Sequence, residues 1–275
     1  MRYSDRLIRV IRIAEREANS RESAVDSIHI WLGLLLENSG PLAEVNQQYS
    51  DLLPFMLIQA EKQPPGRGES NIRPFMEKVT HEISILMGRA LDEMKRYNQV
   101  VMNEGHVIRG LCGLTHSLSE KKKEEILKIA AMPRDMFVHL ENYQFPDNFL
   151  YKGEIRRAQT EDLDEVMAFI REEFGERWVS TAIEGFHHEE IPIRLSYSGG
   201  ILTGFACYDI TGKGVFGPMG TSIKFRQQGT GSALLHHCLK DMKRRGCDSI
   251  KIQQAGPIEF YEKACGARLS KSTFS

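Results

Sequence analysis

The segment F-R-Q-Q-G-T-G-S-A-L-L, residues 225–235, is expected to follow a strand and to open a long amphipathic helix that continues to about Arg245. Two glycines in it, Gly229 and Gly231, allow the backbone to turn sharply and to approach a ligand closely. Arg226 adds a full positive charge beside the roughly half charge of the helix dipole. Six successive backbone amides should point at this spot: those of Gln227, Gln228, Gly229, Thr230, Gly231 and Ser232. The segment therefore predicts an anion-binding turn that would accept a pyrophosphate.

The residues around this turn predict alternating strands and helices from Gly153 onward. The expected strands are residues 154–158, 193–197, 201–210, 215–223 and 249–253, and the expected helices before the turn are 161–174 and 178–186. Gly199-Gly200 suits a two-residue hairpin turn between the second and third strands. A dinucleotide-binding fold is excluded, because G-x-G-x-x-G is absent and hairpin-like strands precede the turn.

A second motif, F-Y-E-K-A-C-G at residues 260–266, follows the last of these strands. Together with R-Q-Q-G-T-G, it closely resembles the GNAT superfamily of acetyl-CoA-dependent N-acetyltransferases, over residues 153–275. The resemblance implies an α/β (α+β) fold with a mixed, mainly antiparallel sheet. It also implies acetyl-CoA as the acyl donor and no metal.

The resemblance assigns roles to individual residues. The amides named above should cradle the CoA pyrophosphate beside Arg226, and the backbone around Thr221 and Ser222 should pair with the pantetheine arm. Gln254 stands where the family often has an Asn after its fifth strand, and the resemblance implies that it also binds the cofactor. Tyr261 matches the tyrosine beside the thioester sulfur, and would protonate the departing CoA thiolate as a general acid. The alternative for Tyr261 is a helix tyrosine that packs on the sheet.

The implied mechanism is direct attack of a neutral primary amine on the thioester carbonyl in a ternary complex. A backbone N–H of the fourth strand would stabilise the oxyanion. That strand, F-G-P-M-G-T at residues 216–221, has no glutamate, so the resemblance transfers no general base. Four residues are candidates from topology alone: Asp209, Glu173, Glu176 and His188.

Three further features of this half need an explanation. Arg177 and Trp178 fall where the family usually lines its acceptor pocket, and the alternative is a helix-capping loop with a core tryptophan. Pro218 predicts an irregular or edge position in the fourth strand, because proline has no N–H to donate. Only residues 267–275 follow the second motif, whereas the family usually has two more strands there. One strand is therefore expected to be missing or to come from a partner chain, as in a homodimer.

The first half of the chain has helical periodicity up to about residue 143. Pro146 and Gly153 then break helical character within residues 143–153. The sequence therefore predicts an all-α domain over residues 1–143, a linker over 144–152 and the second domain over 153–275.

This first half also repeats itself. S-I-H-I-W-L-G-L-L at residues 27–35 aligns at an offset of 77 with E-G-H-V-I-R-G-L-C at residues 104–112, and the proline- and glycine-rich segment 63–70 separates the copies. The pattern resembles the double-repeat N-terminal domain of the Clp protein unfoldases. The resemblance implies a bundle of about eight helices that binds substrates or adaptors. His29 and His106, one in each copy, are expected to cap or pack at helix starts rather than to bind a ligand. No phosphate-binding G-x-x-x-x-G-K-[ST] loop accompanies the pattern, so no ATPase is expected.

The composition argues against several classes of binding partner. The 36 basic and 37 acidic residues give a net charge of −1, which argues against nucleic-acid binding. No apolar run approaches the roughly 18–20 residues of a membrane helix, and the start lacks a signal-peptide pattern. Five scattered cysteines without C-x-x-C spacing favour a reducing compartment and no zinc site. We therefore expect a cytoplasmic protein that binds neither nucleic acid nor membranes.

Two functions follow from these patterns. The first is transfer of an acetyl group from acetyl-CoA to a primary amine of a small molecule or protein, with residues 1–143 recruiting a substrate or a partner protein. The alternative is a non-catalytic sensor or adaptor that binds CoA and engages a partner through the helical domain. The first function is the preferred interpretation, and the missing glutamate and the short C-terminal segment are the features that support the alternative.

Overall fold

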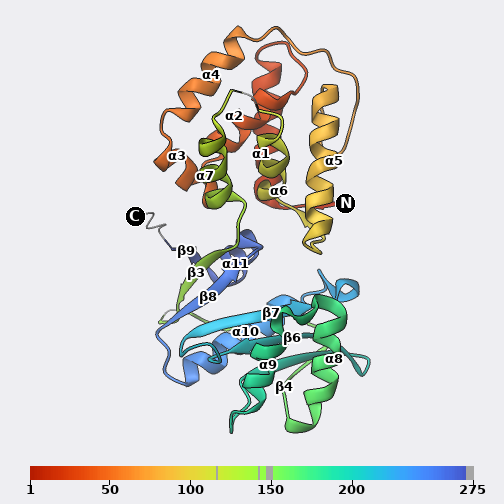
Figure 1. Cartoon of the computed structure of the whole chain (residues 1–275), viewed down its shortest axis with the longest axis vertical. Coiled ribbons are helices and arrows are strands. Elements are labelled where there is room, and N and C mark those ends of the chain that lie inside the picture. The colour runs from red at the N-terminus through yellow and green to blue at the C-terminus, as the bar shows by residue number, and fades with distance from the viewer. Residues whose placement is uncertain (116, 142, 147–150, 271–275) are drawn as a thin grey trace. The chain divides into compact units, whose positions relative to one another are not determined.

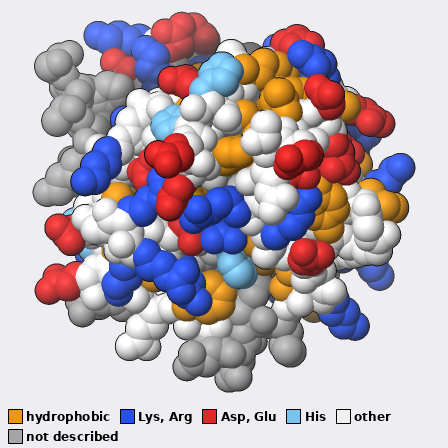
Figure 2. Space-filling view, turned by 90° about the horizontal axis from the view of Figure 1, so that it is seen from below, with side chains coloured by type: hydrophobic (Ala, Val, Ile, Leu, Met, Phe, Trp, Pro, Cys, Tyr) orange, Lys and Arg blue, Asp and Glu red, His pale blue; other side chains and the backbone are white. Residues whose placement is uncertain are grey.

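The computed structural model describes residues 1–115, 117–141, 143–146 and 151–270 (Figure 1). It divides into two compact units, of which the first is Met1–Pro133 and the second begins at Arg134. Across the described ranges, no helix is both long enough and apolar enough to cross a membrane. Figure 2 shows one face of the molecule, on which basic and acidic side chains are interspersed, in keeping with the nearly balanced charge.

The first unit is helical. Its elements are β1 (Arg2–Tyr3), α1 (Asp5–Asn19), α2 (Ser27–Glu37), α3 (Pro41–Gln48), α4 (Leu52–Lys62), α5 (His81–Arg96), β2 (Val101–Met102), α6 (Glu104–Cys112) and α7 (Glu120–Ala130). Helix α1 packs against α2 and α5 packs against α6, so the apolar stripes predicted from helical spacing form one core. Residues 64–69 form neither helix nor strand, as their prolines and glycines predicted.

Both histidines of the sequence pattern cap helices, as predicted. At the start of α2, Asp26 Oδ1 accepts the N–H of His29 at 3.2 Å, and His29 Nδ1 accepts the N–H of Asp26 at 3.3 Å. Asn103 and His106 form the same reciprocal pair at the start of α6, at 3.2 and 3.0 Å. Two otherwise unpaired amides are satisfied at each helix start, which accounts for a histidine at this position without any chemistry.

The buried cap at His106 predicts a pH-dependent stability. Burial, helped by the nearby charge of Arg109, lowers the pKa of His106 to about 4. Because this value lies below the roughly 6.5 of an unfolded histidine, the stabilisation is complete above pH 6.5 and is lost as the pH falls towards 4. We expect His106→Gln, which keeps an acceptor for the cap, to reduce the loss of unfolding free energy over this range, by at most about 1.4 kcal/mol per pH unit.

Urea titrations at pH 7, 6 and 5 would measure this effect. Trp31 is buried in the first unit, so its fluorescence in a Trp178→Phe background reports on that unit alone. His81 is exposed, and His81→Gln serves as the control that should leave the pH dependence unchanged. If the free energy of unfolding depends equally on pH in the parent protein, His106→Gln and His81→Gln, the effect cannot be assigned to His106.

The second unit is a seven-stranded sheet with helices on both faces (Figure 1). Its elements are β3 (Arg134–His139), β4 (Glu154–Arg157), α8 (Leu163–Phe174), α9 (Val179–Phe186), β5 (Ile193–Ser198), β6 (Ile201–Tyr208), β7 (Val215–Thr221), α10 (Thr230–Arg244), β8 (Ser249–Ala255), α11 (Ile258–Cys265) and β9 (Arg268–Leu269). Among the described residues the strand order is β4-β5-β6-β7-β8-β3-β9, in which only β7 and β8 are parallel. The predicted mixed, mainly antiparallel sheet is therefore confirmed.

Alternation along the central strand β6 separates the two helical layers. Phe205 and Cys207 pack in the cluster with α8 and α9, whereas Ala206 and Tyr208 pack in the cluster with α10 and α11. Gly199 and Gly200 have φ angles of +58° and +79°, and they join β5 to β6 in the predicted two-residue turn.

Strand β3 corrects the predicted domain boundary. It lies within residues 1–143, which were expected to be helical, yet it pairs with β8 on one side and with β9 on the other. Its alternating side chains Met136 and Val138 are 0% and 2% exposed in the core of the second unit. The division therefore falls between Pro133 and Arg134, and not at residue 143.

The same strand corrects the expectation for the C-terminal segment. After α11 the described chain adds only β9, as the short C-terminal segment predicted, and the place between β8 and β9 is taken by β3. That strand comes from the chain itself, from upstream, and not from a partner chain. Within the predicted linker 144–152, residues 147–150 lie outside the described residues.

Candidate active site

The parallel strands β7 and β8 separate along their length. They pair at Val215↔Lys251 and Phe216↔Ile252, and no further pair joins them in the described part of the chain. Beyond this point β7 continues to pair with β6, and β8 with β3. Because the two strands are parallel, their carboxyl ends open at the same edge of the sheet (Figure 1).

Gly217 and Pro218 mark the point of separation. Gly217 has a φ of +120°, and Pro218 has no N–H for a ladder hydrogen bond. The register between β6 and β7 shifts between Ala206 and Tyr208, opposite this point. The predicted irregularity at Pro218 is confirmed, whereas the edge position is wrong, because β7 is a central strand.

The backbone of β7 offers hydrogen-bonding groups to the opening. The Ser222 N–H donates to Thr203 O of β6 at 2.9 Å. Since successive residues of a strand alternate in direction, Gly220 also faces β6, and Met219 and Thr221 face away from it. Of the predicted pair, Thr221 therefore directs its backbone groups into the opening, and Ser222 does not.

The glycine-containing turn lies next to this strand end. Gln227 and Gly229 have φ angles of +65° and +88°, and α10 begins directly afterwards at Thr230. A Cβ added to Gly231 would lie 3.6 Å from Thr221 Oγ1 and 3.7 Å from the ring of Phe260. The end of β7, the first turn of α10 and helix α11 therefore meet here, and the predicted residues Thr221 to Ser232 lie together.

Arg226 and Glu173 hold residues 221–223, which lead into the glycine-containing turn. The half-buried Arg226 donates from Nε to Thr221 O at 2.9 Å, and burial lowers the pKa of its guanidinium although Glu173 opposes the shift. Glu173 Oε1 accepts the hydroxyl of Ser222 at 2.6 Å, and its Oε2 accepts the N–H of Ile223 at 3.1 Å. Both oxygens of Glu173 are engaged, so this carboxylate anchors the turn and is a poor candidate for a base.

The other predicted bases are not brought to the opening. Asp209 Oδ1 accepts the N–H of Gly214 at 2.7 Å, in the turn before β7 and thus at the opposite end of that strand. Glu176 pairs with Arg171 at 3.2 Å. His188 lies exposed in the segment after α9. None of the four predicted candidates therefore places a carboxylate or an imidazole where it could act as the base.

Gln254 lies near the end of β8, in the left-handed region with a φ of +49°. Its N–H donates to Asp135 Oδ1 at 2.9 Å, and its Oε1 accepts Arg177 Nη2 at 3.4 Å. Arg177, which was predicted to line the acceptor pocket, lies in the connection between α8 and α9 and reaches Gln254 near the end of β8. Sequence reasoning missed Asp135, because its strand was assigned to the helical domain. The alternation of Met136 and Val138 was the available signal.

Tyr261 is 7% exposed and packs against the sheet. Its ring makes edge contacts with Phe216 of β7 and Phe260, at centroid distances of 6.4 and 4.9 Å. Burial, with a smaller effect of Cys265, raises the pKa of Tyr261, so the phenol stays protonated at neutral pH. Trp178 is an aromatic core residue that contacts Phe174 and Phe205.

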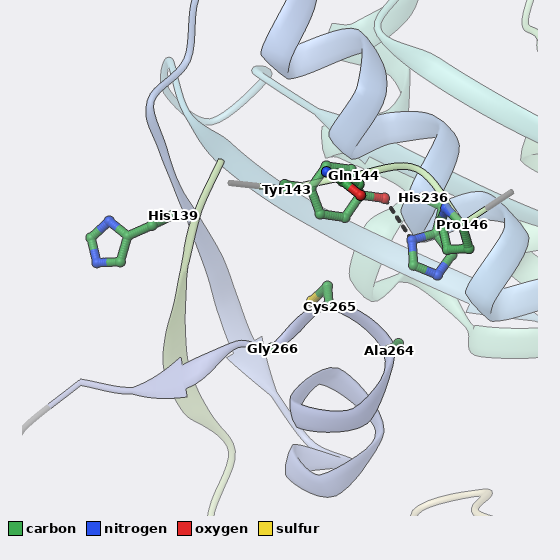
Figure 3. A pocket seen from close by; sticks show the side chains of 8 residues that line it. All are labelled: His139, Tyr143, Gln144, Pro146, His236, Ala264, Cys265 and Gly266. Carbon is green, nitrogen blue, oxygen red and sulfur yellow. Dashed lines mark hydrogen bonds between the residues drawn. The ribbon is translucent and has the colours of Figure 1, made fainter. Parts of the chain in front are cut away.

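A pocket of about 300 Å³ is lined by other residues of this unit (Figure 3). Its lining comprises His139, Tyr143, Gln144, Pro146, His236, Ala264, Cys265 and Gly266. The hydroxyl of Tyr143 and Nδ1 of His236 are 2.6 Å apart, which joins the chain after β3 to α10. None of the predicted cofactor-binding or catalytic residues lines this pocket.

Comparisons with known proteins agree with the fold of this unit. Residues 155–267 match the sequence model described as "Acetyltransferase (GNAT) family". No curated protein sequence matches the chain. The family match does not include the helical unit, whose resemblance to the Clp N-terminal domain stays a prediction.

Solved structures that match part of the chain include a GCN5-related N-acetyltransferase from Sphaerobacter thermophilus. The two share 20% identity over 55% of this chain and 54% of that one, with a TM-score of 0.42. A GCN5-related N-acetyltransferase from Kribbella flavida shares 13% identity over 68% and 72%, with a TM-score of 0.39. The glucosamine N-acetyltransferase region of a fungal multi-domain β-N-acetylglucosaminidase shares 15% identity over 57% and 22%, with a TM-score of 0.44.

The chain spans about half of the Sphaerobacter protein and about a fifth of the fungal one. The fold described above and the family match agree on the same residues of the second unit. Residues 155–267 are therefore an acetyltransferase domain of the GNAT family, and the prediction of an enzyme is confirmed for this part of the chain.

Proposed function

We propose that the second unit transfers an acetyl group from acetyl-CoA to a primary amine of a small molecule or a protein. The observation that carries this proposal is the opening between β7 and β8 beside the turn before α10. A strand with an available backbone edge and an anion-binding turn lie together there. The family of residues 155–267 supports the same reaction class.

Acetyl-CoA would bind in two parts. Its pyrophosphate would lie on the amides of residues 227–232, at the positive end of α10 and near Arg226. Its pantetheine arm would lie along β7, where the backbone of Met219 and the N–H of Thr221 face away from β6 and can pair as they would with another strand, while the Thr221 carbonyl accepts Arg226 Nε. This arrangement would place the thioester near the point at which β7 and β8 separate.

The reaction would proceed by direct attack in a ternary complex. A neutral amine forms the C–N bond, the C–S bond breaks, and the Met219 N–H would stabilise the oxyanion between these events. Tyr261 would donate its proton to the departing thiolate, and the proton lost by the amine would leave through water. The surroundings of Glu173 and Asp209 support a route without a carboxylate base.

Replacement of Tyr261 by Phe tests the role of the general acid. We expect kcat to fall about 100-fold with a change in the KM for acetyl-CoA below about threefold, because general acids typically contribute 10²–10⁴-fold. Release of free CoA thiol across a panel of amines would measure both constants. The ring and its packing against Phe216 are retained in this variant.

Tyr143→Phe is the matched control. Tyr143 is also a tyrosine of this unit with a pKa raised by burial, but its hydroxyl contacts His236, and neither residue is among those predicted to bind the cofactor or to act in catalysis. It should keep the wild-type kcat. An unchanged kcat in Tyr261→Phe would show that Tyr261 is not the general acid and that it only packs against the sheet.

The helical unit would recruit an acceptor or a partner protein. The equivalent caps at Asp26–His29 and Asn103–His106 lie at the offset of 77 residues that suggested an internal repeat, and they support the proposed relation to the Clp N-terminal domain. We place the protein in the cytoplasm, as its cysteine usage favours.

A second candidate function is a CoA-binding sensor or adaptor that does not turn over. The engagement of both Glu173 oxygens favours it, since the site then lacks a predicted base. Tight binding of acetyl-CoA without CoA release for any amine, together with capture of a partner by the helical unit, would support this alternative over the enzyme.

A further inference from the structure

Strand β3 brings a side chain to the candidate site from outside the segment that matches the acetyltransferase family. The match begins at residue 155, and β3 ends at His139. Asp135 on this strand pairs across to the end of β8, where its Oδ1 accepts the N–H of Gln254 at 2.9 Å. A residue 119 positions upstream therefore holds the backbone beside the opening.

The conformation of Gln254 makes this hydrogen bond important. A φ of +49° is uncommon for a residue with a side chain, and it persists where the surroundings hold it. The register between β3 and β8 shifts at Arg134–Met136, so a regular ladder cannot hold Gln254 there. The carboxylate of Asp135 supplies the acceptor in place of a backbone carbonyl.

Asp135 is itself fixed. Its second oxygen, Oδ2, pairs with Lys251 Nζ at 2.7 Å. Burial opposes ionisation, but the hydrogen bonds from Lys251 and Gln254 hold the pKa of Asp135 below its usual value. The side chain is therefore an ionised acceptor with both oxygens engaged.

The side chain of Gln254 connects this anchor to the helical layer on one face of the sheet. Its Oε1 accepts Arg177 Nη2, and Arg177 lies in the connection from α8 to α9. Within the described residues Arg177 makes no ion pair, so this amide is the contact that holds it near the end of β8. The anchor of Arg226 to Thr221 lies on the other strand, β7.

We propose that Asp135 is a positioning residue that fixes Gln254, and through Gln254 the side of the site at which the amine acceptor approaches. This inference rests on the proposed function. The sequence resemblance placed Gln254 among the cofactor-binding residues, whereas its side chain contacts Arg177, which was predicted to line the acceptor pocket. The proposal therefore separates the two sides of the opening: β7 and the turn before α10 hold acetyl-CoA, and β3 through β8 shapes the acceptor side.

Steady-state kinetics of the full-length protein test this separation. We expect Asp135→Ala to raise the KM for the amine about tenfold and to leave the calorimetric Kd for acetyl-CoA within about twofold. Asp135→Asn keeps an oxygen that accepts the Gln254 N–H, and should restore the KM to within about threefold of the wild type. Lys251→Met removes only the ion pair and should behave like Asp135→Asn. An effect in Lys251→Met equal to that in Asp135→Ala would overturn the proposal in favour of the ion pair.

Gln254→Ala provides a second variant, which removes an exposed amide without touching the core. It should raise the KM for the amine as Asp135→Ala does, and a wild-type KM would overturn the proposal even if Asp135→Ala failed to fold.

Exchange of the Gln254 amide hydrogen, followed by NMR in the absence of substrates, tests the anchor without turnover. We expect exchange at least about tenfold faster in Asp135→Ala than in Asp135→Asn. Unchanged exchange would overturn the inference whatever the activity. Faster exchange in a protein that acetylates no amine would support the anchor and refute the proposed function.

Discussion

Replacement of Gly229 by Asp is expected to raise the Kd for acetyl-CoA at least about 100-fold, and to abolish turnover with it. Gly229 precedes α10 with a φ of +88°, a conformation that a side chain disfavours. The new carboxylate would also lie at the positive end of α10, where it would repel the pyrophosphate. Isothermal titration calorimetry with acetyl-CoA measures the effect directly.

Gly246→Asp is the matched control, because Gly246 follows the same helix and has a φ of +79°. It carries the same backbone strain and the same new charge, at the end of α10 that is far from the turn. We expect it to lower the melting temperature without changing the Kd. Loss of binding in both variants would attribute the effect to stability, and wild-type binding in Gly229→Asp would refute the anion-binding turn.

A fragment that begins at residue 153 is expected to be insoluble or unfolded, whereas one that begins at residue 134 is expected to fold. The shorter fragment lacks β3, so β8 and β9 lose their shared partner and present unpaired edges. It also loses the buried side chains of Met136 and Val138. Loss of two buried apolar side chains costs about 3–6 kcal/mol, a large part of a domain's stability.

Circular dichroism, thermal unfolding and size-exclusion chromatography of the two fragments distinguish these outcomes. A cooperative transition in the longer fragment and aggregation of the shorter one are the expected pair of results. A shorter fragment that unfolds cooperatively at the same temperature as the longer one would show that β3 adds nothing to the core.

Features set by local sequence were predictable. The turn at Gly199-Gly200 follows from two residues that both tolerate positive φ, and the glycine-containing turn before α10 follows from the spacing of Gly229 and Gly231. The caps at His29 and His106 depend on contacts within one helical turn. In each case the sequence that specifies the structure lies within a few residues of it.

Features that depend on distant pairing were not predictable. Strand β3 is six residues long and follows a helical run directly, so the short alternation of Met136 and Val138 was its one local signal. Its place in the sheet comes from pairing with β8 and β9. The base candidates failed for a related reason. Topology alone gave no partners for Glu173 and Asp209, and each carboxylate is occupied by a backbone amide in the folded chain.

The place of β3 in the chain also sets an order of events during synthesis. The hydrogen bond between Asp135 and Gln254 joins residues 119 positions apart. At ordinary rates of translation, about 5–20 residues per second, β3 waits on the order of ten seconds before β8 exists to pair with it. During that time Met136 and Val138 are exposed on an unpaired strand, while all residues of the helical unit, which precede it in the sequence, have been made. We therefore expect this strand to be a site of aggregation in the nascent chain until β8 has been made and can pair with it.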